Sequence, residues 1–117
     1  MFYLNRVMLA GRVLSPPEVR YTRQGKAVVM FSVRTPVDLP FPLEGFQGEV
    51  EVKVVAFGPQ GERWAEGVRV GDNVFVEGDL SQRVWEGEAF LKREMIVVAR
   101  RITFIKGGRD GEPEKGL

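Results

Sequence analysis

The stretch V-F-V-E-G-D-L-S-Q-R-V-W, residues 74–85, decides the fold of this chain. Apolar Val74, Val76 and Leu80 fall on one face of this stretch and mostly polar residues on the other, which is typical of a β-strand with one buried and one solvated face. We expect that alternation to hold along the whole strand. Gly78 interrupts it, and a glycine inside a strand marks a bulge or a sharp bend because it has no Cβ. A long strand that bends is what a small closed barrel needs at its corner.

Arg83 and Trp85 lie two residues apart near the end of this stretch, so both side chains point to the same side. A cation beside a large flat ring suits a single-stranded nucleic acid, because one binds a phosphate and the other stacks on a base. The alternative is a surface arginine beside a half-buried tryptophan that fills the barrel rim. The stretch alone leaves both interpretations open.

Cysteine and histidine are both absent from the 117 residues. A disulfide framework, a cysteine zinc site and a thiol nucleophile are therefore excluded. The commonest general base and metal ligand is missing as well. We predict a protein that is not an enzyme, with no catalytic residues, no metal and no cofactor.

Charge is unevenly distributed, although the net charge is only +1. Residues 1–34 carry six basic groups against one acid, residues 35–79 carry three against nine, and residues 80–106 carry six against three. This split indicates one basic face rather than a uniformly basic protein. The alternative is a solvated surface with charge pairs across strands.

Alternating apolar residues predict four more strands, at residues 5–13, 27–35, 50–58 and 89–105, the last interrupted near 99–101. Residues 18–23 extend the first connection as a hairpin arm. Residues 59–67 predict a short helix that starts at Pro59 and ends at Gly67, with Trp64 plugging the barrel end. Residues 35–49, rich in proline and glycine, predict a long loop. The pattern favours an all-β fold: a five-stranded OB-type Greek-key barrel with one short helix between strands three and four. An SH3-like barrel stays open on pattern alone.

Residues 1–106 are expected to form one domain, and residues 107–117 a short disordered tail, since the tail has no apolar periodicity. No apolar run approaches the length of a membrane span, and the start of the chain does not read as a secretion signal.

Five features, in order and at matching spacing, resemble the bacterial single-stranded DNA-binding protein (SSB) family over nearly all of residues 4–105. They are N-R-V-M-L-A-G at 5–11 followed by P-E-V-R-Y at 17–21, G-K-A-V at 25–28 leading to Thr35, V-V-A-F-G at 54–58, N-V-F-V-E-G-D-L-S-Q-R-V-W at 73–85, and V-V-A-R-R-I-T-F-I at 97–105.

This resemblance implies an OB fold that binds single-stranded DNA without sequence preference, in replication, recombination or repair. It implies a homo-oligomer built through the first strand, with a tetramer favoured and a dimer left open, in a cytoplasmic, nucleoid-associated protein. Replication or repair proteins are further expected partners, and no membrane is. The expected stacking rings are Trp85, Phe57 and Phe41. The expected phosphate or polar contacts are Arg83, Lys53, Arg34, Arg12, Arg6 and Lys92.

The chain departs from the family pattern at three places. Glu51 and Leu39 stand where tryptophans are common, and the long linker with an acidic, apolar-tipped tail is missing. These departures keep one alternative open: a PriB-like primosome accessory protein that acts mainly through protein contacts. An OB-fold nuclease would need a carboxylate cluster such as Asp72, Glu77 and Asp79, but the family pattern itself carries the acid before Gly78.

Overall fold

The computed structural model describes residues 1–87 and 89–105. The elements follow one another as β1 (Val7–Val13), β2 (Glu18–Tyr21), β3 (Ala27–Pro36), β4 (Glu49–Phe57), α1 (Gly58–Gly67), β5 (Asn73–Glu86) and β6 (Leu91–Phe104). The predicted tail at 107–117 lies outside the described residues. Within the described ranges, no helix is both long and apolar enough to cross a membrane.

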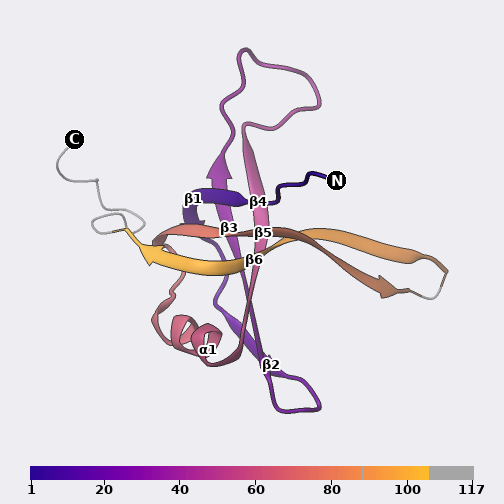
Figure 1. The fold of residues 1–117 in the computed structure, drawn as a ribbon. Helices are drawn as coiled ribbons and strands as arrows, with labels where there is room; N and C mark the ends of the chain where they lie inside the picture. Colours follow the sequence, from indigo (N-terminus) through magenta and orange to yellow (C-terminus); the bar gives the residue numbers. More distant parts are fainter. Residues whose placement is uncertain (88, 106–117) are drawn as a thin grey trace.

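The strands pair into a sheet that closes on itself (Figure 1). Pairing runs β1–β5–β6–β4–β3 and returns to β1, because β1 also pairs with β3 at Arg12 and Val13. All neighbours are antiparallel except β4 and β6. This ring of five strands, with α1 between the third and the fourth, confirms the predicted OB-type fold. The short β2, predicted as a hairpin arm, is a sixth strand that pairs with the start of β3.

Every second side chain of the barrel strands points into the ring, and these side chains form the core. β3 buries Phe31 and Val33, and β5 buries Val74 and Val76. Valine suits these positions because its branched side chain packs well on a pleated surface. Trp64 of α1 packs against this core, as predicted.

Gly78 allows β5 and β6 to approach closely. A Cβ there would clash with the carbonyl oxygen of Val98 and lie 2.9 Å from its carbonyl carbon. The register shifts between Glu77 and Gly78, which leaves Arg100 as the extra residue of a β-bulge. The predicted bend at Gly78 and the predicted interruption at 99–101 are therefore one feature seen from two strands.

Beyond the bulge, β5 and β6 continue as a two-stranded arm, residues 80–86 and 91–95, that extends away from the barrel, whereas Ile96 and Val97 still pair with β4 (Figure 1). On its back face, Leu80 and Val84 are 44% and 52% exposed. The prediction of one buried face along the whole strand is therefore wrong here. The barrel interior ends near the bulge, so the alternation continues where there is little core left to bury it.

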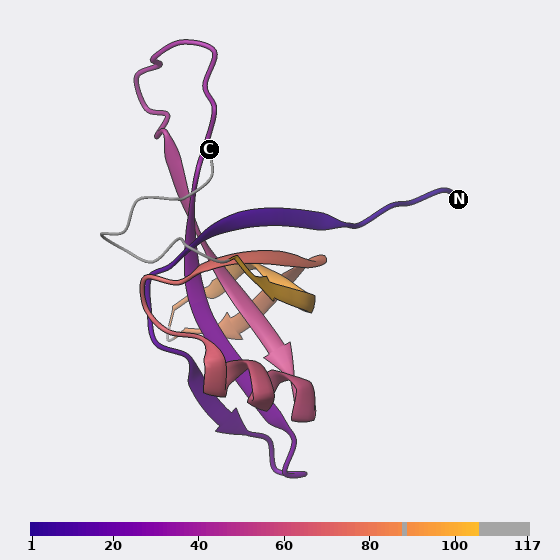
Figure 2. The same ribbon diagram turned by 90° about the vertical axis from the view of Figure 1, so that its left-hand side faces the viewer.

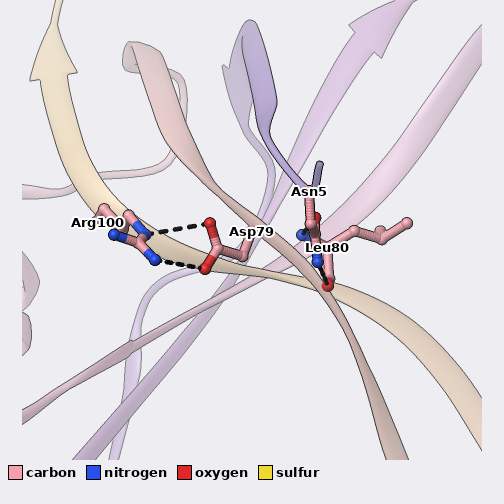
Figure 3. A network of polar contacts seen from close by, with 4 residues as sticks. All are labelled: Asn5, Asp79, Leu80 and Arg100. Atoms are coloured by element: carbon pink, nitrogen blue, oxygen red, sulfur yellow. Dashed lines mark hydrogen bonds and ion pairs between the residues drawn. The ribbon is translucent and has the colours of Figure 1, made fainter. Parts of the chain in front are cut away.

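Side chains fasten the base of this arm (Figure 3). The Asn5 amide donates to the Leu80 carbonyl and accepts from its N–H, each at 2.8 Å. Since Val7 pairs with Gly78, Asn5 stands where the next pair of the β1–β5 ladder would fall, and its side chain continues the ladder. Around the bulge, the Arg100 guanidinium donates two hydrogen bonds to Asp79, at 3.1 and 2.8 Å.

Helix α1 lies at one end of the barrel, close to β2 (Figures 1 and 2). It begins at Gly58, one residue before the predicted start, and Gly58 takes a φ of +70° that favours glycine. The Tyr21 hydroxyl donates a hydrogen bond to Glu62 at 3.2 Å and so links β2 to α1.

Candidate nucleic-acid interface

The surface of β3, β4 and β6 that faces away from the core forms an apolar floor. Three pairs across β3 and β4 share this face: Val28–Phe57, Met30–Val55 and Ser32–Lys53. Parallel pairing places β6 beside β4 and adds Ile96 and Val98. Its apolar part, Val28, Met30, Val55, Ile96 and Val98, consists of side chains that a flat base can cover without a lost hydrogen bond.

A groove of about 420 Å³ runs over this floor. Phe57 stands at one side, Arg83 of β5 at another, and Arg20 and Tyr21 of β2 complete the wall. Phe57 is 54% exposed and also lines a second cavity of about 680 Å³ against α1. Its ring therefore stands between two hollows, where it is accessible to a ligand.

Arg83 and Trp85 project from the arm onto the same side, as their spacing predicted. The Arg83 guanidinium lies 4.9 Å from the centroid of the Trp85 ring, within the range of a cation–π contact. Arg83 also approaches the Met30 sulfur of the floor, with Nη1 at 3.8 Å. Trp85 remains 38% exposed, so the ring is not sunk in the core. It lies next to Arg83, which lines the groove, but does not line the groove itself.

Lys53 lies farther along β4, on the same face as Phe57. It lines a neighbouring cavity of about 330 Å³ that shares Met30 with the groove. Its ammonium is 3.7 Å from Glu94, which pairs across the arm with Arg83. One carboxylate thus lies between two cations on this face, which moderates the positive potential without removing it.

Lys92 lies opposite Trp85 in the β5–β6 register, and its Nζ is 5.7 Å from the centroid of the Phe90 ring. The arm therefore carries a second cation beside an aromatic ring, close to the first. Lys92 joins Arg83 and Trp85 on one side of the arm.

Arg34 and Arg12 lie elsewhere. They are register partners across β1 and β3 and line a separate cavity of about 230 Å³. The Arg34 guanidinium is 3.6 Å from Glu49, and Glu51 lies directly opposite it on β4. The structure does not bring these two arginines to the groove.

Arg6 precedes β1, and its charge lowers the pKa of the Asp79 carboxyl. The two hydrogen bonds from Arg100 hold the pKa of the Asp79 carboxyl below its ordinary value of 3.8, and the charges of Arg100 and Arg6 lower it further against a desolvation effect. On β2, the hydrogen bond to Glu62 raises the pKa of the Tyr21 hydroxyl. These groups fix the arm and β2 in place around the groove.

Phe41 lies in the loop between β3 and β4, at the opposite end of the β3–β4 hairpin from Phe57 (Figure 1). β4 runs from Glu49 to Phe57, a span of roughly 26 Å. The structure therefore separates Phe41 from Phe57, and its contact with DNA stays a prediction.

Residues 4–105 match the model of the single-strand binding protein family. The chain belongs to this family. Its groove, lined by Phe57 and Arg83 over an apolar floor, with Trp85 next to Arg83, is thus a feature of a single-strand binding family member.

Two relatives in Thermus thermophilus are each called a single-stranded DNA-binding protein. One is 36% identical over 117 residues, which span 97% of this chain and 44% of that protein. The other is 36% identical over 98 residues, which span 82% of this chain and 37% of that protein. The chain thus spans less than half the length of these relatives.

A solved structure of a Plasmodium falciparum SSB complex with ssDNA superposes with a TM-score of 0.76. It covers 90% of this chain and 97% of that chain at 23% identity. The likeness shows that the two share a fold.

Sequence reasoning missed two groove residues of this family member, Arg20 and Tyr21, and also Lys26, which lines the second cavity beside Phe57. The signal was available, because Arg20 and Tyr21 again place a cation next to an aromatic ring. Lys26 has no such marker, since only the packing of the β2–β3 turn against α1 brings it to the cavity beside Phe57.

Proposed function

We propose that this chain binds single-stranded DNA without sequence preference, in replication, recombination or repair. The observation that carries the proposal is the placement of Phe57, Arg83 and Trp85 on one accessible side of the sheet, around an apolar floor. A duplex would not fit this chemistry, because its bases are already stacked on each other.

Binding then combines two physical effects. Phe57 and Trp85 stack bases, which is worth about 1–3 kcal/mol per base and tolerates any sequence because every base has a π-face. Arg83, Arg20, Lys53 and Lys92 neutralise phosphates and release counterions, which makes affinity depend on salt. Phe41, Arg34, Arg12 and Arg6, remote from the groove or engaged elsewhere, would make secondary contacts on a longer strand.

Family membership and the Thermus relatives support this role over the primosome accessory alternative, which the comparisons do not favour. The role is one of binding without catalysis. It places the protein wherever single strands arise, which in a bacterium is the cytoplasmic nucleoid.

We also propose that the protein is a homo-oligomer assembled through β1. Residues Val7 to Arg12 pair with β5 on one edge, whereas pairing with β3 on the other edge involves Arg12 and Val13 in the described chain. Met8 projects from this strand and is largely exposed. A second copy could extend the sheet along the remaining edge and cover this side chain.

The test of the binding role is a titration of labelled oligo-dT at fixed salt with Trp85→Ala. We expect about 10- to 100-fold weaker binding, the equivalent of one lost stacking contact. Trp85→Phe, which keeps a ring, should lose much less. Val84→Ala, altered on the opposite face of the same strand, should bind like the parent. Equal affinity of Trp85→Ala and the parent would show that Trp85 stacks on no base.

A further inference from the structure

The loop between β3 and β4, residues 37–48, exposes a set of large apolar side chains. Phe41 and Phe46 are 59% and 65% exposed, and Val37 and Leu43 are also exposed. Several such side chains on one short segment indicate a contact surface rather than scattered surface residues.

The backbone of this loop is held in a defined conformation by hydrogen bonds. Val37 donates a backbone hydrogen bond to Gly48 at 2.8 Å, and Phe46 donates one to Leu43 at 3.1 Å, closing a turn in which Gly45 has a φ of +85°. Prolines at positions 36, 40 and 42 further restrict the backbone. Little conformational entropy is therefore left to lose when the loop docks.

The loop is also acidic. It contains Asp38 and Glu44 but no lysine or arginine, and Glu49 and Glu51 follow it. The carboxylates repel a phosphate chain, so DNA would bind this loop less well than it binds the groove. The groove has the opposite chemistry, since the described residues that line it combine Arg20 and Arg83 with an apolar floor and include no acid.

We propose that loop 37–48 of one copy docks in the groove of a second copy. Carboxylates of the loop would face Arg20 and Arg83, and its phenylalanine rings would cover the floor. An anion next to a flat ring is also the chemistry of a nucleotide, so the loop and a single strand would compete for one site. This inference rests on the proposed function for the identity of the competitor.

The occupant must come from a second copy because of the geometry of the β3–β4 hairpin. The loop leaves the hairpin at the Pro36–Glu49 pair, and the groove is reached at the Val28–Phe57 pair, roughly 26 Å away along paired strands. Figure 1 shows the loop pointing away from that end. The contact is head-to-tail, so it would link copies into chains that a single strand of DNA takes apart.

The first test uses a dye-labelled synthetic peptide of residues 37–48 and the full-length protein, read by fluorescence anisotropy. We expect binding that weakens as salt rises from about 50 to about 300 mM and that excess oligo-dT reverses. A control peptide with Asp38→Lys and Glu44→Lys should bind about tenfold more weakly or worse, a difference of about 1.4 kcal/mol.

The proposal is overturned if both peptides bind alike, or if the acidic peptide stays bound while oligo-dT saturates the protein. Direct oligo-dT binding is measured in parallel. Binding of oligo-dT, when neither the peptide nor the sedimentation test below shows docking, removes this inference alone, whereas failure of oligo-dT to bind removes the proposed function.

A second test covers the case in which the free peptide loses the shape of the loop. Sedimentation at low salt compares the parent with two full-length variants, Asp38→Lys/Glu44→Lys and Arg20→Glu/Arg83→Glu. We expect species larger than the basal oligomer in the parent, their loss in each variant alone, and their return when the two variants are mixed. The proposal is contradicted if the variants associate as the parent does. It is also contradicted if the loop binds an unrelated basic protein but does not bind a second copy of this chain.

Discussion

Among the glycines that the structure describes, Gly78 leaves the least room for an added methyl group. Its Cβ would meet backbone atoms of Val98, which cannot rotate away as a flexible side chain would. We therefore expect Gly78→Ala to lower the free energy of unfolding by about 1–3 kcal/mol, as overpacking does elsewhere. Urea unfolding of the parent and of the variant measures this loss of stability. Gly48→Ala is the control, because a Cβ there meets nothing within 4 Å, and equal effects of the two variants would contradict the close approach.

Asp79 and Arg100 make stability depend on pH at the bulge. Hydrogen bonds from Arg100 hold the pKa of Asp79 below its ordinary value of 3.8 in the folded state. A lowered folded-state pKa means that the contribution is complete above about pH 4 and is lost as pH falls through the lowered value. The urea midpoint of Asp79→Asn should therefore lie below that of the parent at neutral pH and converge with it in strong acid.

Arg100→Gln provides the control for this pair, since the effect of Asp79→Asn should shrink once its partner is gone. A gap between parent and Asp79→Asn that stays constant from neutral to strongly acid pH would mean that the carboxylate charge contributes nothing.

Among the elements, β1 is the one through which we propose that copies of the chain assemble. Its inward residues join the core, and Met8 projects outward on the strand whose edge is only partly paired in the described chain. We expect Met8→Glu to shift the protein to a smaller species in sedimentation without changing its free energy of unfolding by more than about 0.5 kcal/mol. Val70→Glu, an exposed apolar residue outside the strands, is the matched control. If Met8→Glu sediments as the parent does, assembly uses another surface.

The β5–β6 pair shows how one hairpin serves two purposes at different points along its length. Before Gly78 it closes the barrel with Val74 and Val76, and after it the arm carries Arg83 and Trp85 to the groove. The bulge at Arg100 separates these two halves. A bend at this place therefore decides where the cation and the ring stand.

At the scale of the whole molecule, the sequence predicts what depends on neighbours along the chain. Alternation and glycine placement located the five barrel strands, the bend at Gly78 and the shared side of Arg83 and Trp85. The alternation of side chains shows on which face of a strand a residue lies, but not how close it lies to a given end of a hairpin. It could therefore not separate Phe41 and Arg34 from Phe57. Burial of Leu80 and Val84 was predicted wrongly because alternation cannot distinguish a barrel strand from an arm that leaves the barrel.

The distribution of charge over the whole chain leads to the last prediction. A protein of net charge +1 attracts a polyanion only where its cations gather, and on the groove side these include Arg83. Log affinity for oligo-dT should fall linearly with log salt, and Arg83→Ala should reduce the steepness of that slope by about 0.7, the value for one phosphate on a single strand.

Two variants serve as controls. Trp85→Ala should weaken binding without changing the slope, because stacking releases no counterion. Arg63→Ala, on α1 and bonded to Gln60 at 2.7 Å, should leave both slope and affinity as in the parent. Equal slopes for the parent and Arg83→Ala would mean that this guanidinium contacts no phosphate and serves only to hold the Trp85 ring.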